Sequence, residues 1–269
     1  MFAELPKGPR LYYEVAGEGP PLLFVSGLGG NHTAWTLTVP QFAKRWQCIT
    51  FDNRGTGESD VPPGPYTIEE MADDAAALLE VLGIEGAACV GVSLGASVLQ
   101  AMAYRHPARI ARLVLISAFP SYTEVQHRWL DAHIALRKAG LDPLSSFVAQ
   151  SPWTFTAKTL GDHDGLIRLA RLLLEQPNRT TDEGFFAQAA AIRNFDSRPN
   201  LPRVTAPTLV LTGAEDVLTP IAQAVEIAEL IPNAHLQVLP RGGHGMVGEY
   251  HDDVMRAVRA FLDRQVPFR

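Results

Sequence analysis

Short runs of apolar residues alternate along the chain with longer segments in which apolar residues recur at helical spacing. Many of the short runs end in glycine or aspartate. This alternation is typical of βα units, and it predicts an α/β fold in which helices flank a mainly parallel central sheet. The predicted strands are residues 10–15, 21–26, 47–52, 87–92, 112–117, 207–212 and 234–239.

Helices are predicted in the segments between these strands. Thr67, followed three residues later by Glu70, has the pattern of a capping box at a helix start. Behind it, apolar residues repeat at helical spacing at Ile68, Met71, Ala75, Leu78, Leu79 and Leu82. Further helices are predicted over residues 94–106 and 219–231, and in a last segment with Val254, Val258, Phe261 and Leu262.

The alternation stops between the strands at 112–117 and 207–212. About 85 residues with a helical pattern intervene there, where a typical connection has about 4 to 6. We therefore predict a helical cap, residues 119–203, inserted into a core made of residues 1–118 and 204–269. Its aromatic residues either form a small core of their own or roof an apolar pocket; they are Trp129, Phe147, Trp153, Phe155, Phe185 and Phe186.

Composition and charge narrow the class of protein. Apolar residues make up 46% and charged residues 19%, which is typical of a chain that buries a core. The net charge is −6 and the 23 Lys and Arg are scattered, so nucleic acid is not an expected partner. The first residues lack a secretion-signal pattern and no apolar run reaches the length of a membrane span, so we expect no membrane association.

Cys48 and Cys89 each lie inside an apolar run that predicts a buried strand. Two cysteines in such positions indicate reduced core thiols, and hence a reducing, cytoplasmic compartment. No CxxC or His/Cys cluster indicates a metal site, and no phosphate-binding or dinucleotide-binding motif occurs. We therefore expect neither metal nor cofactor.

A candidate nucleophile lies in Gly91-Val92-Ser93-Leu94-Gly95, a G-x-S-x-G motif. An apolar strand runs directly into the motif and a helical segment leaves it, so the chain must turn sharply at Ser93. Such a turn projects a serine hydroxyl toward substrate, and the N–H of Leu94 at the helix start is placed to stabilise an oxyanion. The alternative interpretation is an ordinary βα turn.

A serine nucleophile requires a general base, and the base requires an orienting acid. His244 is the candidate base, because it lies in a glycine-rich loop between the last strand and the last helix. Asp216 is the candidate acid, at the end of a strand and between serine and histidine in chain order, with Glu215 as its rival. An aspartate that only fixes its own turn is the alternative.

Acyl transfer also requires a second oxyanion donor. The loop Ser26-Gly27-Leu28-Gly29-Gly30 follows the strand that would neighbour the nucleophile's strand. The backbone N–H of Leu28 is our candidate for this donor.

These motifs together resemble the α/β-hydrolase family, and the resemblance covers nearly the whole chain outside the inserted segment. The order Ser93, Asp216, His244 is that of the family, residues 52–59 resemble its D-x-R-G-x-G-x-S turn, and residues 213–220 resemble its G-x-x-D-x-x-x-P segment. Within the family, residues 62–69 are similar to 3-oxoadipate enol-lactonases and residues 26–30 to aminoacrylate hydrolases. Many relatives have His-Gly at 26–27 and His at 92, so the substrate is left open.

The resemblance and the motifs predict a serine hydrolase of the carboxylesterase or lactonase type. Its substrate would be a small carboxylic ester, lactone or related acyl compound, cleaved through an acyl-serine intermediate. Carbon–carbon bond hydrolysis, perhydrolysis or a lyase reaction on the same triad, and a slow-turnover ligand receptor, stay open as alternatives. Arg128, Arg137 and Arg193 are open candidates for binding a substrate carboxylate. The oligomeric state is also open, with a homodimer through an apolar cap face as one alternative.

Overall fold

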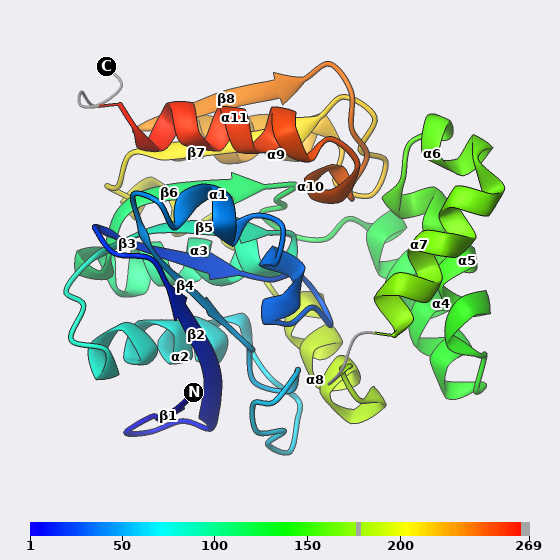
Figure 1. Cartoon of the computed structure of the whole chain (residues 1–269), viewed down its shortest axis with the longest axis horizontal. Helices are drawn as coiled ribbons and strands as arrows, with labels where there is room; N and C mark the ends of the chain where they lie inside the picture. The colour runs from blue at the N-terminus through cyan, green and yellow to red at the C-terminus, as the bar shows by residue number, and fades with distance from the viewer. Residues whose placement is uncertain (176–178, 265–269) are drawn as a thin grey trace.

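The computed structural model describes residues 1–175 and 179–264. Its eight strands form one sheet in the order β1-β2-β4-β3-β5-β6-β7-β8 (Figure 1). Antiparallel pairing joins β1 to β2 and β2 to β4, and every pairing from β4 to β8 is parallel. The strands are β1 Phe2–Glu4, β2 Arg10–Ala16, β3 Pro21–Val25, β4 Gln47–Phe51, β5 Ala87–Val92, β6 Ile110–Ile116, β7 Thr208–Gly213 and β8 Ala234–Leu239.

All seven strands predicted from the apolar pattern are present: residues 87–92 and 234–239 match at both ends, and the ends of the other five differ by at most two residues. The short strand β1 was not predicted, because three residues with only Ala3 buried carry no periodic signal. The parallel register pairs Val25 with Gly91, Val92 with Ile116, and Ile116 with Leu211. The carboxyl ends of β3, β5, β6 and β7 therefore meet at one edge of the sheet.

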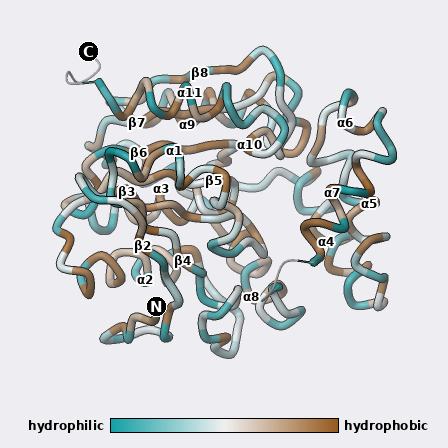
Figure 2. The backbone as a smooth tube through the Cα atoms, in the orientation of Figure 1, coloured by the Kyte–Doolittle hydropathy of each residue, from teal (hydrophilic) through white to brown (hydrophobic). Residues whose placement is uncertain are grey.

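Two apolar layers cover the two faces of the sheet, and Figure 2 shows apolar residues concentrated along the central strands. One layer includes buried residues of α2, α3 and α9, and the other includes buried residues of α1 and α11. The helices and 3₁₀ turns outside the inserted segment are η1 His32–Trp35, α1 Val39–Phe42, α2 Ile68–Val81, α3 Leu94–Arg105, η2 Pro107–Arg109, η3 Leu201–Arg203, α9 Ile221–Leu230, α10 Met246–Glu249 and α11 His251–Leu262.

The inserted segment is helical, as its pattern predicts. Figure 1 shows α4 to α7 grouped beyond the carboxyl ends of the parallel strands, whereas α8 lies against the main body. Among the aromatic side chains of this segment, Phe185 is buried in the apolar layer that includes α2, α3 and α9, and Trp129 packs against that layer. Phe147 and Phe155 contact each other. The helices are α4 Glu124–Lys138, α5 Pro143–Thr154, α6 Ala157–Gly161, α7 His163–Leu174 and α8 Asp182–Arg193.

Both cysteine side chains are free and buried in the sheet. Burial raises the pKa of the Cys48 thiol to about 12. Across residues 1–175 and 179–264, no helix combines the length and apolar character needed to cross a membrane, and no cluster of three metal-ligating side chains occurs.

The predicted capping box at the start of α2 is present. The Thr67 hydroxyl accepts a bond from the Glu70 N–H at 3.1 Å, and the Glu70 carboxylate accepts one from the Thr67 N–H at 2.8 Å. Replacing Thr67 by alanine is expected to lower the free energy of unfolding by about 1 kcal/mol, because a helix N–H loses its acceptor. Denaturant unfolding measures the change. Thr67→Ser keeps the oxygen and is expected to stay close to the parent; an equal loss in both variants would contradict the capping role.

Candidate active site

Ser93 occupies a strained turn between β5 and α3. Its backbone has φ 54° and ψ −119°, values that residues other than glycine rarely adopt. The flanking glycines allow the turn to form: a Cβ on Gly91 would lie 2.6 Å from the carbonyl oxygen of Gly95, and a Cβ on Gly95 would clash with the Val25 carbonyl. The strand–turn–helix context predicted for the motif is therefore confirmed, and the ordinary βα turn is not what forms here.

His244 lies beside this turn. Its Nε2 atom is 2.9 Å from the Ser93 Oγ, and it reaches there from the loop between β8 and α10. The glycines around it serve close packing: the Gly245 N–H donates to the Thr154 carbonyl at the end of α5 (2.7 Å), and a Cβ on Gly243 would lie 2.8 Å from the same oxygen. The loop that carries the imidazole is thus held against the inserted segment.

Asp216 lies on the other side of the imidazole. Its Oδ2 is 3.2 Å from the His244 Nδ1, and the carboxylate is buried. The rival acid Glu215 is exposed, and its backbone N–H donates to the Gly242 carbonyl at 3.1 Å. The structure therefore brings Ser93, His244 and Asp216 together and leaves Glu215 outside.

Thr219 is a member of this cluster that the sequence analysis treated only as a helix start. Its hydroxyl donates to the Asp216 Oδ2 at 2.7 Å and lies 3.1 Å from the His244 Nδ1. The prediction of a helix beginning at 219 was wrong by two residues, because Pro220 is the N-cap and α9 begins at Ile221. A hydroxyl three residues after Asp216 was the available signal, since aspartate often accepts bonds from nearby residues in its own turn.

The Asp216 carboxylate collects several hydrogen bonds. Its Oδ1 accepts the N–H groups of Leu218 (3.0 Å) and Thr219 (2.7 Å), in addition to the bonds at Oδ2. Burial by itself raises the pKa of Asp216, but the neighbouring His244 and the bonds from Thr219 outweigh burial and hold that pKa below its usual 3.8. The acid is therefore ionised at neutral pH and can fix the imidazole with its Nε2 toward Ser93.

The two predicted oxyanion donors lie on segments that meet at Ser93. Leu94 follows Ser93 as the first residue of α3, and a Cβ on Gly27, one residue before Leu28, would lie 3.4 Å from the Ser93 Cβ. Within residues 1–175 and 179–264, neither the Leu28 N–H nor the Leu94 N–H donates a hydrogen bond. Backbone N–H groups without a partner can stabilise a developing oxyanion when they point toward it.

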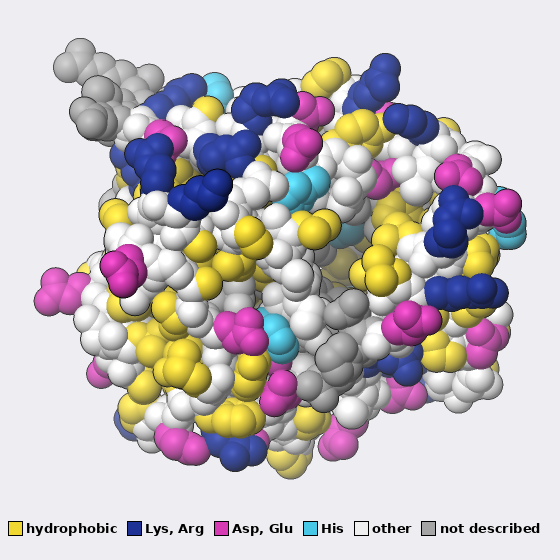
Figure 3. Space-filling view, in the orientation of Figure 1, with side chains coloured by type: hydrophobic (Ala, Val, Ile, Leu, Met, Phe, Trp, Pro, Cys, Tyr) yellow, Lys and Arg dark blue, Asp and Glu magenta, His cyan; other side chains and the backbone are white. Residues whose placement is uncertain are grey.

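The surface is hollowed between the main body and the helices α4 to α7 (Figure 3). The arginines considered for a substrate carboxylate are engaged elsewhere. Arg137 pairs with Asp182 and Arg193 pairs with Asp131. Arg128 lies 3.7 Å from Asp131 on the exposed side of α4.

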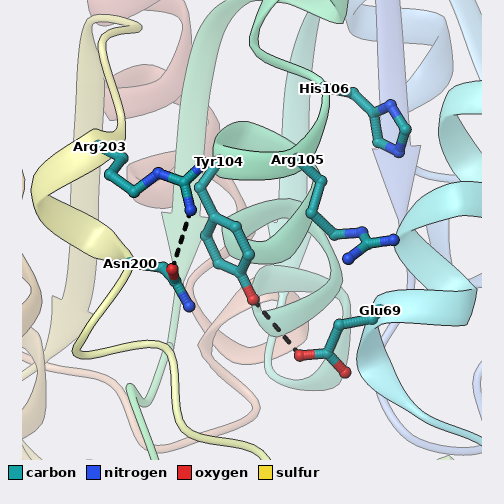
Figure 4. Close-up of a pocket in the computed structure, with 6 residues that line it drawn as sticks. All are labelled: Glu69, Tyr104, Arg105, His106, Asn200 and Arg203. Atoms are coloured by element: carbon teal, nitrogen blue, oxygen red, sulfur yellow. Dashed lines mark hydrogen bonds between the residues drawn. The ribbon is translucent and has the colours of Figure 1, made fainter.

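A separate cavity of about 520 Å³ opens beside Tyr104 and Arg105 (Figure 4). These residues end α3, whereas Ser93 is the N-cap at its start. The cavity wall includes a bond from the Tyr104 hydroxyl to Glu69 (3.4 Å) and one from Arg203 to Asn200 (3.1 Å). Arg105 and His106 on its rim are both bound to Asp73. These polar groups satisfy one another, and the cavity lies apart from the serine.

Several known proteins are similar to this chain over most of its length. The model of the alpha/beta hydrolase fold family matches residues 20–249. The 3-oxoadipate enol-lactonase 2 of Acinetobacter baylyi is 31% identical over 231 residues, covering 85% of this chain and 84% of that protein. A Caulobacter segnis protein named as a carbamate hydrolase, RutD, is 31% identical over 241 residues, covering 87% of each chain.

Solved structures agree with these relatives. The enol-lactonase of Burkholderia xenovorans has a TM-score of 0.86 and 28% identity, covering 98% of this chain and all of that one. A thermophilic esterase of Thermogutta terrifontis has a TM-score of 0.82 and 29% identity, covering 97% and 98%. The family resemblance and the fold predicted from the sequence are thereby confirmed, and the relatives support hydrolase activity. The chain belongs to the alpha/beta hydrolase fold family.

Proposed function

We propose that this protein is a serine hydrolase that cleaves a small carboxylic ester, lactone or related acyl substrate through an acyl-serine intermediate. The observation that carries the proposal is the 2.9 Å contact between the Ser93 Oγ and the His244 Nε2, with His244 held in turn by Asp216. The relatives named as an enol-lactonase and an esterase support the same class of reaction.

The reaction follows from the roles of these groups. His244 takes the proton of Ser93 as its Oγ attacks the acyl carbon, and the carbonyl electrons move to oxygen. The N–H groups of Leu28 and Leu94 stabilise that oxyanion. When the intermediate collapses, the leaving oxygen takes the proton from His244. Water, activated by the same imidazole, then releases the acid and restores Ser93.

We also propose that residues 119–203 form a cap over this site. Two features support it: α4 to α7 stand beyond the carboxyl ends of the strands (Figure 1), and the end of α5 binds the loop that carries His244. The hollow beneath these helices would receive the substrate (Figure 3). The free, buried thiols of Cys48 and Cys89 support a reducing, cytoplasmic compartment.

The first test removes the nucleophile. Ser93→Ala is expected to lower kcat for p-nitrophenyl acetate by at least about 10³-fold, because no hydroxyl remains to accept the acyl group. Ser97→Ala is the matched control, since Ser97 is buried one turn along the same helix. A fluorophosphonate probe, followed by intact-protein mass, should label the parent and Ser97→Ala but not Ser93→Ala. Turnover by Ser93→Ala at the parent rate would refute the proposal.

The second test separates the two neighbouring acids. Asp216→Asn is expected to lower kcat by about 10³- to 10⁴-fold, because the amide no longer orients and stabilises the imidazolium. Glu215→Gln is expected to stay within about twofold of the parent, since its side chain is exposed. Steady-state kinetics on the same ester decides. The opposite ranking of the two variants would move the acid role to Glu215.

The third test uses the lowered pKa of Asp216. As the pH falls from 5 through 3.8, an unfolded carboxyl takes up a proton before the folded Asp216 does. The ionised carboxylate therefore stabilises the fold above that range, and this stabilisation is lost as the pH falls to the folded pKa. Urea unfolding of the parent and Asp216→Asn between pH 5 and 3 should show the parent losing stability relative to the variant. A constant difference would contradict the lowered pKa.

A further inference from the structure

Gln188 of α8 is fully buried and bridges two loops at the edge of the sheet. Its Oε1 accepts the N–H of Gly29 at 3.1 Å, and its Nε2 donates to the carbonyl of Arg54 at 2.9 Å. The first loop carries the oxyanion candidate Leu28, and the second is the turn that follows β4. A side-chain amide can accept from one loop and donate to the other at the same time, because its oxygen is an acceptor and its nitrogen is a donor.

The loop that Gln188 reaches is a tight turn. The Gly30 N–H donates to the Gly27 carbonyl at 3.0 Å, so Leu28 and Gly29 are its two central residues. Gly29 has φ +69°, as the second central residue of a type II turn requires. The peptide group between the two central residues is the one that flips when such a turn changes type, and Gln188 holds the N–H of that group.

A second contact from the inserted segment holds the next peptide group. The Thr180 hydroxyl donates to the Gly29 carbonyl at 2.8 Å. The Phe185 ring also lies against Gly29, because a Cβ there would be 3.5 Å from it. Residues at and just before α8 therefore contact the N–H, the carbonyl and the Cα of one glycine.

The helix that carries Gln188 is itself firmly placed. A Cβ on Gly184 would clash with the Gly55 carbonyl, so α8 meets the turn after β4 in backbone contact. The Tyr66 N–H donates to the Ala187 carbonyl at 3.3 Å. Arg54, whose carbonyl binds Gln188, is held by a two-bond pair with the buried Asp74 at 2.6 and 2.9 Å. The amide of Gln188 thus has a rigid support.

We propose that Gln188, assisted by Thr180, is a positioning residue for the oxyanion donor Leu28, so that the oxyanion site is complete only while α8 is seated. The proposal rests on the proposed function, because Leu28 matters only if an oxyanion forms. Gln188 touches no reacting atom. It acts by keeping the turn that carries Leu28 in its observed conformation, with the neighbouring Gly27 packed close to Ser93.

The experiment compares two isosteric variants. Gln188→Met removes both hydrogen bonds at nearly constant volume. Gln100→Met is the matched control: Gln100 is also fully buried and makes two bonds, to Phe119 and Ser197, but it does not contact the loop. Both variants are expected to be less stable than the parent. Only Gln188→Met is expected to lower kcat, by about 10- to 100-fold, because a displaced oxyanion donor loses part of its effect.

Two further readouts distinguish positioning from general damage. In Gln188→Met, the inhibition constant of a trifluoromethyl ketone, whose serine adduct carries an oxyanion, should rise in parallel with the fall in kcat, while KM changes less than about threefold. Hydrogen exchange of the backbone amides at 27–30 should be faster than in the parent, and unchanged in Gln100→Met. If Gln188→Met does not fold, Thr180→Val provides a second test and should show the same pattern more weakly. Thr180→Ser keeps the hydroxyl and should lose less activity than Thr180→Val.

The experiment distinguishes failure of the positioning role from failure of the proposed function. Equal kcat and equal exchange at 27–30 in Gln188→Met and Gln100→Met would overturn the positioning role. If instead the parent shows no turnover that depends on Ser93, the proposed function fails, and the exchange comparison still decides whether Gln188 holds the loop.

Discussion

The arrangement of this protein depends on parallel pairing of neighbouring strands in one register. Because β3, β5, β6, β7 and β8 all run the same way, the loops that follow them open at one edge of the sheet. Ser93, Asp216 and His244 are each carried by one of these loops. These residues lie up to 151 positions apart along the chain, yet Ser93 and Asp216 are both within hydrogen-bond distance of His244.

The site divides between the sheet and the inserted helices. The sheet edge supplies the three side chains and the start of α3, whose free N–H groups favour negative charge. The inserted segment contacts two loops of this edge: α5 binds the loop of His244 and α8 binds the loop of Leu28. Under our proposals, the segment both encloses the substrate and keeps the oxyanion donor in place. Changes in that segment would then alter rate as well as substrate preference.

Local patterns predicted much of this, and the errors have identifiable causes. The capping box at Thr67 and Glu70 was readable because both partners lie within one helical turn. The bond from Thr219 to Asp216 was overlooked although it is equally local, because a Thr-Pro pair also predicts a helix start. The sequence shows only that His244 lies in a glycine-rich loop, and the structure adds that these glycines allow close packing against Thr154.

By itself, the sequence determined the fold class and the strand–turn–helix at Ser93, and it predicted Ser93 and His244 as candidates, because each of these rests on residues close together in the chain. Only the tertiary structure decided which acid faces His244, that Arg137 and Arg193 are paired with carboxylates, and that Gln188 holds Gly29. These facts depend on contacts across as many as 159 positions of sequence. No local pattern encodes such contacts, since they exist only after the helices have packed on the sheet.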